Sequence, residues 1–520
     1  MLLPFIVGTK FKMLASIKHL LELYRLALAF RRHGALRALA DMPMMPAWMP
    51  RTLRAITFFV PRKRGLPECD GERLAVALST MGPAYIKVGQ TLATRPDVVG
   101  SALASGLSTL QDRLPPFDGE IAKSIIENSL GGLLSENFAE FNSVPVAAAS
   151  IAQVHKAVTV DGDVVAVKVL RPEIKKRFNR DLDLFQWLAA VAERHVPDAR
   201  RLRLTAVVET LRVSTGEEMD LRTEATAATE LAHNMQGEVG YRIPKIDWDK
   251  TSEQVMTIEW VDGIRFNDVD AIKAAGHDMQ ALSSNIVQIF LKQALRDGFF
   301  HADLHQGNLM VEKDGTIAAV DFGIMGRLSK IERRFFAEIL YGFIKRDYKR
   351  VAEVHFDAGY IPLDQDVEAF TEALRAIADP IMDLPVEEIS VGELLGQLFA
   401  TTEQFEMKAQ PQLLMLQRTM MMAEGMALHL DARANMWDIS RPVLEEWVRE
   451  NLSPEVRLAD FLNDLPRLLE RLPARLERFL DVAEAQDQTV QPAEKDTSSP
   501  LPIFAAGLIV GAVTLKILLL

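Results

Sequence analysis

The chain has almost no cysteine: Cys69 is the only one among 520 residues. An intramolecular disulfide is therefore excluded, and a single thiol is typical of a protein kept in a reducing compartment. Cys69 stands beside Asp70 in a loop-like stretch, without a pattern that indicates catalysis. The first residues also lack the small-residue cleavage site of a secretory signal peptide. We expect a large intracellular protein with room for two or three core-bearing units.

Basic residues are outnumbered by acidic ones, 59 to 71, but they are concentrated at the start of the chain. The net charge is −12, whereas residues 1–64 hold twelve Lys or Arg against only Glu22 and Asp41. Over Phe11–Arg32, apolar residues recur near helical spacing between the basic ones. A basic amphipathic helix suits an anionic membrane lipid surface, although the same stripe could pack on the body of the protein. The acidic remainder makes nucleic acid a poor partner, and we expect none.

The C-terminal end carries a long apolar run. Residues 483–500 are polar and predict a flexible linker, and residues 501–520 are apolar apart from Lys516. A helix over that run would measure about 28 Å, close to the hydrocarbon core of about 30 Å. The sequence therefore predicts a transmembrane anchor. Gly507 and Gly511 form a GxxxG step that could pair two such helices in a homodimer.

One short segment gives the clearest indication of chemistry. The chain reads His-Ala-Asp-Leu-His-Gln-Gly-Asn from His301 to Asn308, and one predicted hairpin later it reads Asp321-Phe322-Gly323. Asp303 could position a reacting hydroxyl or water. The amide oxygen of Asn308 and the carboxylate of Asp321 would bind Mg²⁺, which prefers oxygen ligands and phosphates. This is the spacing of the catalytic loop and metal-binding segment of protein kinases.

Two upstream segments supply the other parts of such a site. Lys168 lies inside the apolar strand Val164–Leu170, where an unpaired ammonium group is unfavourable and should meet a phosphate or carboxylate. Alanines stand where a kinase carries its glycine-rich loop, and they lack glycine's freedom at positive φ, so this loop should be stiffer. The residues predicted to bind ATP there are Val146, Ala147, Ala148, Ala149, Ser150, Ile151, Ala152, Gln153 and Val154.

These motifs together resemble the UbiB family of atypical kinase-like proteins, the bacterial relatives of mitochondrial coenzyme Q kinases. Two further signatures strengthen the resemblance: Lys87-Val88-Gly89-Gln90 matches the family's KxGQ motif, and Glu218-Met219-Asp220 matches its ExD motif. The resemblance covers roughly half of the chain. The catalytic loop departs from the family pattern at Leu304 and Gln306, where prolines are usual, and this could loosen its backbone.

The resemblance implies roles for the matching residues. Lys168 should pair with Glu224 and contact the α and β phosphates, and Lys87 should pair with Glu218 near the active site. The KxGQ segment would then cover the groove in which a kinase admits a peptide. The long gap between Lys168 and Glu224 must hold an inserted helix, and Ile174–His195 has the required apolar periodicity. Without the resemblance, solvated helix charges would be the favoured interpretation of both glutamates.

A hinge and a fold class follow from the same resemblance. At Ile258-Glu259-Trp260-Val261, the Glu259 carbonyl and the Val261 backbone would bond adenine, with Ile258 as gatekeeper. The expected fold is α+β, a two-lobed protein-kinase-like fold, mostly helical, with an N-terminal helical KxGQ extension and a C-terminal transmembrane helix. The predicted boundaries are 1–64 for the basic membrane-surface segment, 65–145 for the extension, 146–262 for the N-lobe, 263–482 for the C-lobe, 483–500 for the linker and 501–520 for the anchor.

The sequence leaves two classes of function open. The first is an enzyme that hydrolyses Mg²⁺-bound ATP or transfers its phosphoryl group. By resemblance it would support ubiquinone biosynthesis at the bacterial inner membrane, with its catalytic domain on the cytoplasmic side. Its partners would be isoprenoid-phenol quinone precursors and quinone-biosynthesis enzymes. The second is a scaffold in which ATP orders a lipid-binding surface. All the catalytic residue types are present, which favours the enzyme, and the KxGQ segment disfavours a peptide substrate.

Overall fold

The computed structural model describes residues 21–38, 48–93, 99–110, 114–195, 200, 203–382, 405–407 and 411–452. Contacts divide the chain into two units, Met1–Trp447 and Val448–Leu520, and the first holds the elements discussed below except the last four residues of helix α20 (Met436–Asn451). Among the described residues, no helix is both long and apolar enough to cross a bilayer. The predicted linker and transmembrane helix, residues 483–520, lie outside these ranges and stay predictions.

Short helices between residues 48 and 107 form a bundle around the KxGQ motif, whereas the sequence prediction placed this extension at 65–145. Its helices are α2 (Trp48–Ile56), α3 (Asp70–Met81), α4 (Pro83–Ala93) and α6 (Ser101–Leu107). Leu74, Leu78 and Leu107 lie in its core. Helices α3 and α6 cross closely because glycine faces glycine: a Cβ added to Gly71 would lie 2.8 Å from the Cα of Gly106.

The basic segment before this bundle has one buried and one exposed face. Residues 21–32 are helical, and Ala27 and Phe30 are buried, Phe30 within the core of the bundle. Leu21 and Tyr24 are 61% and 45% exposed. One face of this helix therefore packs on the protein, which is one of the two alternatives drawn from the sequence. That the exposed face contacts an anionic membrane stays a prediction. Residues 11–20 lie outside the described ranges.

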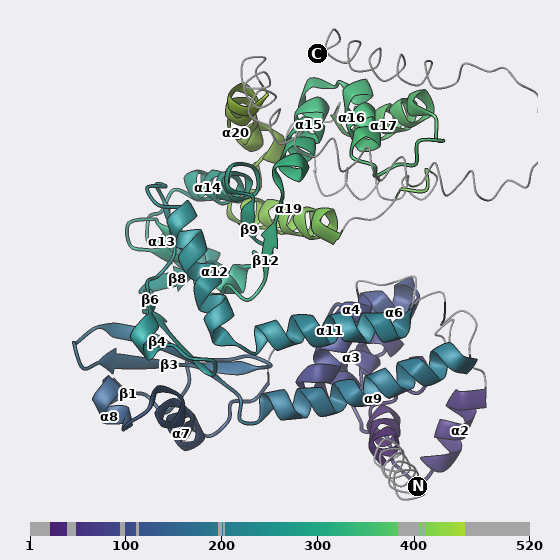
Figure 1. Ribbon diagram of the computed structural model, residues 1–520, viewed down its shortest axis with the longest axis vertical. Coiled ribbons are helices and arrows are strands. Elements are labelled where there is room, and N and C mark those ends of the chain that lie inside the picture. Colours follow the sequence, from purple (N-terminus) through teal and green to yellow (C-terminus); the bar gives the residue numbers. More distant parts are fainter. Residues whose placement is uncertain are drawn as a thin grey trace, which may run out of the picture. The chain divides into compact units, whose positions relative to one another are not determined.

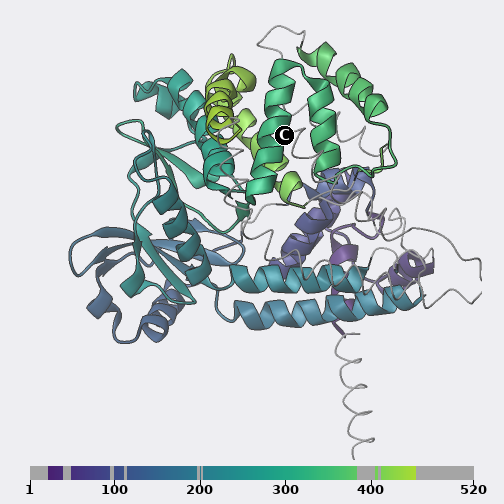
Figure 2. The ribbon, with the colours of Figure 1, turned by 45° about the horizontal axis from the view of Figure 1, so that its top comes forward.

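The insertion between Lys168 and Glu224 contains two long helices rather than one. Helix α9 spans Ile174–His195, with the predicted bounds, and α11 spans Leu204–Glu218. They lie side by side in both views (Figure 1, Figure 2). The rings of Tyr85 on α4 and Phe185 on α9 form an edge-to-face pair with centroids 5.0 Å apart. The insertion thus packs on the KxGQ extension.

The N-lobe is built on an antiparallel sheet in the order β1-β3-β4-β7-β6, with β2 paired to β3. Its elements are α7 (Gly119–Leu130), α8 (Leu134–Asn137), β1 (Phe138–Phe141), β2 (Ala147–Ala148), β3 (Ala152–Thr159), β4 (Val164–Leu170), β6 (Ile246–Asp247), η2 (Trp248–Lys250) and β7 (Val255–Glu259). Side chains alternate between the two faces of a strand. Val165, Val167 and Val169 pack in one core with α7. Lys168 therefore projects from the opposite face, between Val154 of β3 and Met256 of β7.

The C-lobe is mostly helical and holds two small sheets. Its helices are α13 (Val269–Ala274), α14 (Met279–Leu291), the π-helical η3 (Lys292–Asp297), α15 (Lys330–Lys345), α16 (Tyr348–Asp357), α17 (Val367–Met382), α19 (Pro411–Leu430) and α20 (Met436–Asn451). Its strands are β5 (Tyr241–Arg242), β8 (Gly263–Arg265), β9 (Phe299–His301), β10 (Leu309–Glu312), β11 (Ile317–Ala319) and β12 (Met325–Arg327). Strands β10 and β11 form the predicted hairpin between β8 and β5, and β9 pairs with β12.

Helix α19 carries the methionine-rich stretch of the sequence and packs along α14. The Ser283 hydroxyl of α14 donates a hydrogen bond to the Ala427 carbonyl of α19 at 3.1 Å. Met420 and Met426 are buried, whereas Met421 is 46% exposed. One face of this helix therefore packs in the core, and the other face is open to solvent.

Candidate active site

Lys168 and Glu224 are in contact. Glu224 lies on the buried face of helix α12 (Leu221–Asn234), together with Leu221 and Ala225. A carboxylate in such surroundings needs a cationic partner. The Oε1 of Glu224 lies 2.6 Å from the Nζ of Lys168, and their side chains are 8% and 13% exposed. The same Nζ lies 3.5 Å from the Oδ2 of Asp321, so three elements contribute to one cluster.

This cluster holds two carboxylates and one ammonium group. Burial opposes the charge of Lys168, but Asp321 and Glu224 together outweigh it and raise the lysine pKa. Burial raises the pKa of Glu224, and the like charge of Asp321 adds to this while Lys168 opposes it. Burial acts to raise the pKa of Asp321 too, yet Lys168 and the Gly323 N–H lower it overall. The excess negative charge favours a further cation beside Asp321.

His301 fixes the backbone of the catalytic loop. Its buried ring accepts the Asp303 N–H at Nδ1, at 3.2 Å, and its Nε2 lies 2.7 Å from the carbonyl oxygen of Asp321. Because a carbonyl oxygen can only accept, the ring is the neutral tautomer with its proton on Nε2. Burial lowers the pKa of His301, which favours this neutral form. The His301 ring thus links the catalytic loop, which carries Asp303, to the segment that carries Asp321.

Asp303 is held more loosely than Glu224. Its side chain is 23% exposed, and its carboxylate lies 3.5 Å from the Nη2 of Arg418 and 3.8 Å from the Nε2 of His305. Next to Arg418, the buried Thr419 hydroxyl lies 3.1 Å from the Ala302 carbonyl oxygen and 2.9 Å from the Met415 carbonyl oxygen of its own helix, so its proton is shared between the two. Helix α19 is thereby attached to the catalytic loop. Sequence reasoning missed Arg418, which follows Asp303 by 115 residues and belongs to none of the motifs.

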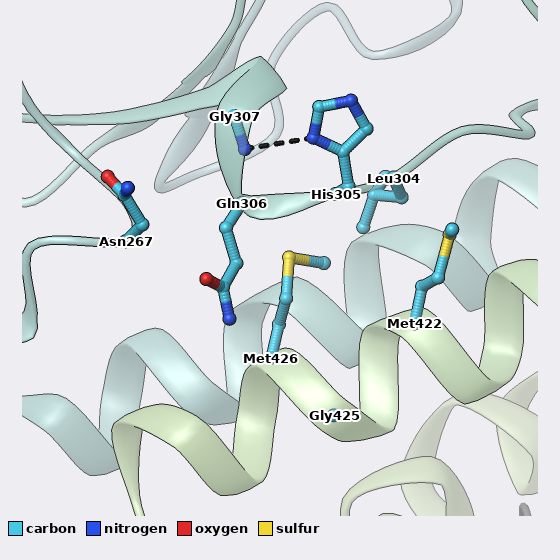
Figure 3. Close-up of a pocket in the computed structure, with 8 residues that line it drawn as sticks. All are labelled: Asn267, Leu304, His305, Gln306, Gly307, Met422, Gly425 and Met426. Carbon is cyan, nitrogen blue, oxygen red and sulfur yellow. Dashed lines mark hydrogen bonds between the residues drawn. The ribbon is translucent and has the colours of Figure 1, made fainter. Parts of the chain in front are cut away.

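The loop positions that depart from the family pattern have different surroundings. Leu304 is fully buried and adds to the core. Gln306 begins the 3₁₀ turn η4 (Gln306–Asn308), and its side chain extends toward α19 (Figure 3). The Gly307 N–H donates to the Nδ1 of His305 at 3.0 Å. A Cβ on residue 307 would lie 2.8 Å from the His305 ring, so a side chain there would displace that ring.

Asn308 and Asp321 fit a magnesium site. The Nδ2 of Asn308 donates to the Asp303 carbonyl at 3.2 Å, so the amide oxygen is the atom that could bind a cation. The Oδ1 of Asp321 accepts the Gly323 N–H at 3.0 Å. Mg²⁺ keeps several waters and takes phosphate oxygens, so one carboxylate and one amide are a sufficient protein contribution. These oxygen donors and the excess negative charge therefore suit the predicted ion.

The alanine loop is a tight hairpin. The N–H of Val146 donates to the Val154 carbonyl and the N–H of Ala149 to the Ala152 carbonyl, both at 2.8 Å. Arg171, which follows β4, donates to the Ala149 carbonyl from Nε at 3.1 Å and from Nη2 at 2.8 Å. Sequence reasoning missed this clamp. The hydrogen bonds from Arg171 hold the backbone of the alanine loop, whose conformational freedom is already reduced because alanine replaces glycine.

The side chain of Gln153 faces away from the nucleotide loop. It is fully buried, accepts the Phe117 N–H at 3.0 Å and donates to the Phe117 carbonyl at 3.2 Å. Its Nε2 also lies 2.8 Å from the Nε2 of His155. Strand alternation places residues 153 and 155 on the face opposite Lys168. The Gln153 side chain therefore does not reach the predicted nucleotide site, and ATP binding by the rest of the stretch from Val146 to Val154 stays a prediction.

The predicted hinge follows β7. The N–H of Glu259 donates to the Lys245 carbonyl at 2.8 Å, and its carboxylate lies 3.0 Å from Arg242. The Glu259 carbonyl is thus the atom that could meet adenine. The Trp260 N–H donates to the Val164 carbonyl at 3.0 Å, and the next residue, Val261, is buried. The hinge backbone is therefore tied to the edge of β4, although the bonds to adenine stay predictions.

Comparison with known proteins agrees with this geometry. The ABC1 atypical kinase-like domain matches residues 109–355, and the UbiB helical domain matches residues 374–435. The probable protein kinase UbiB of Marinobacter nauticus is 39% identical over 438 residues, which cover 84% of this chain and 80% of that protein. The protein of the same name from Azotobacter vinelandii is 36% identical over 516 residues, covering 97% and 94%. This chain belongs to the UbiB family.

Membership makes the chain an atypical kinase-like protein and implies a role in ubiquinone biosynthesis. A solved structure of Rv3197 from Mycobacterium tuberculosis, in complex with erythromycin, aligns with a TM-score of 0.51. That alignment covers 71% of this chain and 93% of the other at 23% identity, so it concerns the fold alone. The predicted family and the kinase-like, mostly helical α+β fold are confirmed.

In this UbiB-family chain, the KxGQ lysine contacts the ExD glutamate. The Nζ of Lys87 on α4 lies 2.5 Å from the Oε1 of Glu218 at the end of α11. Two residues later, the Asp220 side chain accepts the Arg222 N–H and caps α12, which carries Glu224. One short turn thus connects the two lysine–glutamate pairs. That the KxGQ segment covers the substrate groove stays a prediction.

Proposed function

We propose that this protein binds ATP with Mg²⁺ and hydrolyses it, or transfers its terminal phosphoryl group to a small molecule, in support of ubiquinone biosynthesis. The observation that carries this proposal is the meeting of Lys168, Glu224 and Asp321 from three separate elements, at 2.6 and 3.5 Å. His301 links this cluster to the loop of Asp303. An ion pair that served stability alone would not require a second acid on an adjoining loop.

Each side chain has a role in the proposed reaction. Lys168 would contact the α and β phosphates and offset their charge, while Glu224 holds its ammonium group in place. Asp303 would accept a hydrogen bond from the attacking hydroxyl or water and take its proton. A new O–P bond would form as the bond to the β-phosphate oxygen breaks and ADP leaves. Asn308 and Asp321 would hold Mg²⁺, which when bound neutralises charge on the β and γ phosphates.

Turnover of the purified full-length protein tests this proposal. ADP release would be measured with Mg²⁺ and after chelation, with and without a prenylated phenol, and a phosphorylated phenol would distinguish transfer from hydrolysis. Lys168→Met should lower kcat/KM by about 100-fold or more, because a buried positive charge at the phosphates is lost. The matched control is Lys176→Met, since Lys176 is 82% exposed. Equal turnover in Lys168→Met and wild type would contradict the proposal.

The cytoplasmic face of the bacterial inner membrane is the location that we propose for this activity. Phe58 and Phe59 follow α2, are 68% and 94% exposed, and have ring centroids 5.6 Å apart. Burial and then the field of neighbouring arginines, Arg31 first, lower the pKa of Arg62, which follows Phe59 by three residues. Exposed aromatic rings with basic neighbours suit an anionic bilayer surface. The predicted span 501–520 would add a permanent anchor.

Vesicle flotation can separate the two membrane contacts. In protein truncated after residue 482, binding to anionic vesicles should depend on Phe58 and Phe59 and weaken as salt rises. Replacing both rings by serine should release this protein, whereas Leu363→Ser should not, although Leu363 is 87% exposed. The full-length chain should stay bound in high salt. Release of full-length protein by salt would contradict a spanning helix.

A further inference from the structure

Arg418 reaches the catalytic loop from a firmly packed part of α19. Its neighbours Leu416 and Thr419 are buried, and the Thr419 hydroxyl lies 3.1 Å from the Ala302 carbonyl oxygen. Met422, one turn further along the same helix face, lies beside the catalytic loop (Figure 3). The backbone that carries Arg418 is therefore fixed against this loop.

The guanidinium group of Arg418, by contrast, is loosely held. Its side chain is 57% exposed, and its Nη2 lies 3.5 Å from the Oδ1 of Asp303. Arginine binds a carboxylate best through two short parallel hydrogen bonds, and a single long contact near the surface contributes little. Among the residues that the structure describes, no second ion pair or hydrogen bond holds this group. It can therefore change partners while its backbone stays in place.

The proposed nucleotide end offers little positive charge for a transferring phosphoryl group. The catalytic loop, residues 301–308, contains neither lysine nor arginine. Lys168 is already paired with Glu224 and Asp321, so this cluster has no excess of positive charge. In phosphoryl transfer, negative charge spreads over the three equatorial oxygens of the γ-phosphoryl group, and a metal ion offsets only part of it. A further cation beside Asp303 would lie where this charge is met.

Two cationic side chains stand beside Asp303, and Arg418 is the better suited to phosphate. The Nε2 of His305 lies 3.8 Å from the Asp303 carboxylate, but the Nδ1 of the same ring accepts the Gly307 N–H at 3.0 Å, which fixes the ring. An imidazole is charged only when it is protonated, whereas a guanidinium group is always charged and presents several donors to phosphate oxygens.

We propose that Arg418 is a catalytic residue that binds the transferring γ-phosphoryl group, as an arginine finger supplied by the same chain. This inference rests on the proposed function. Without nucleotide, the guanidinium group rests on Asp303. When Mg²⁺-bound ATP arrives, it moves to the equatorial oxygens of the γ-phosphoryl group and leaves the Asp303 carboxylate free. Arg418 lies in the UbiB helical domain, so that domain would complete an active site that the kinase-like domain begins.

The reaction then proceeds with a separate task for each group. Asp303 takes the proton of the attacking hydroxyl or water as the oxygen of that nucleophile forms a bond to the γ-phosphorus. The bond from this phosphorus to the bridging oxygen breaks, and ADP leaves with that oxygen. Arg418 stabilises the charge on the three equatorial oxygens throughout and exchanges no proton.

Kinetics of the full-length protein test this role. Arg418→Gln should lower kcat by about 10²–10³, because it removes a donor to charge that is greatest in the transition state. ATP affinity should change by less than about threefold. Arg418→Lys should keep part of kcat, since it retains the charge but not the fork of donors. The matched control is Arg433→Gln, at a side chain that is 80% exposed beyond the end of α19. Equal kcat in Arg418→Gln and wild type would overturn the inference.

A transition-state mimic separates contact with phosphate from an effect on Asp303. Mg²⁺-bound ADP with aluminium fluoride places a negatively charged fluoride complex where the transferring phosphoryl group would lie. In Arg418→Gln, affinity for this complex should fall by about the same factor as kcat, whereas affinity for ADP alone should be kept. Undiminished affinity for the fluoride complex together with a lower kcat would mean that Arg418 only positions Asp303, and contact with the phosphoryl group would be overturned.

The same measurements separate failure of this inference from failure of the proposed function. If Lys168→Met lost turnover but Arg418→Gln did not, the proposed function would stand and the role of Arg418 would be refuted. If wild-type protein bound ATP but released no ADP, the proposed reaction would be refuted. A selective loss of the fluoride complex in Arg418→Gln would then still support Arg418 as a ligand of the γ-phosphate position. Wild-type protein that bound no nucleotide would refute both.

Discussion

The two ends of the proposed catalytic centre are held in different ways. At the nucleotide end, Lys168 and Glu224 are 13% and 8% exposed and 2.6 Å apart. At the acceptor end, Asp303 is 23% exposed and its cationic neighbours lie 3.5 and 3.8 Å away. Breaking a short, buried ion pair is strongly unfavourable, whereas longer and more exposed contacts contribute little. The nucleotide end is therefore preformed, and the acceptor end can rearrange when a ligand arrives.

The difference follows from the elements that carry each end. Lys168 projects from a central strand, and Glu224 from a helix capped by Asp220. Asp303 lies in a loop between β9 and η4, and Arg418 approaches from a helix far along the chain. A side chain on a helix or strand has less freedom to move than one on a loop, because the backbone that carries it is held by regular hydrogen bonds. Mutations at the two ends should thus affect different kinetic constants.

The largest expected effect is on turnover. Asp303→Asn should lower the turnover number by about 10²–10⁴, the usual contribution of a positioned proton acceptor, and should leave ATP affinity nearly unchanged. Steady-state kinetics and calorimetric titration with ATP measure the two quantities separately. The matched control is Asp364→Asn, at an exposed carboxylate. A loss of ATP affinity equal to the loss of rate would show that the two ends are not separate.

A smaller effect is expected at the buried pair. Glu224→Gln keeps the shape of the side chain but leaves Lys168 with Asp321 as its charged partner, at 3.5 Å. We expect a loss of about 1–3 kcal/mol in the free energy of unfolding, less than for a wholly unpaired buried charge. ATP affinity should fall in the same variant. Urea unfolding measures the stability, and Glu230→Gln, at a more exposed carboxylate of α12, is the control. Equal stability of both variants would refute a preformed nucleotide end.

The hydrogen bonds from Arg171 to the alanine loop should have a smaller effect than the buried Lys168–Glu224 pair. Arg171→Met removes the two hydrogen bonds to the Ala149 carbonyl but keeps an apolar stem beside Phe117. ATP affinity should fall by roughly tenfold, as expected for about 1–1.5 kcal/mol of lost positioning. Hydrogen exchange at the amides of 149–152 should become faster. Unchanged exchange would mean that the hairpin keeps its conformation without the clamp.

The smallest effect is expected for the loop backbone itself. Ala149→Gly adds conformational freedom worth up to about 1 kcal/mol, but the Arg171 clamp would still hold the carbonyl. ATP and ADP affinities should therefore change by less than about fivefold, and more in the Arg171→Met background than in the wild type. Identical affinities for both nucleotides in both backgrounds would remove any role for the alanine in this loop.

Local patterns predicted the elements that have a strong repeat. The bounds of α9, the strand β4 and the hairpin of β10 and β11 agree with the sequence, since each has a clear apolar period or a turn signal. Helix α11 was not predicted. It is rich in valine and threonine, which favour helices weakly, and among its residues only Leu211 and Thr215 are buried. Its stability comes from packing along α9, which no local pattern reveals.

The sequence by itself determined which chemical groups take part. A lysine inside an apolar strand requires an anion, and the resemblance to the UbiB family implied that Glu224 is this partner, with which Lys168 is in contact. Only the tertiary structure decided what surrounds these groups. Arg418 lies 115 residues from Asp303 and Arg171 lies 22 residues from Ala149, at distances where no periodicity links two side chains. Such contacts exist because separate elements pack together, and the packing of the whole chain chooses them.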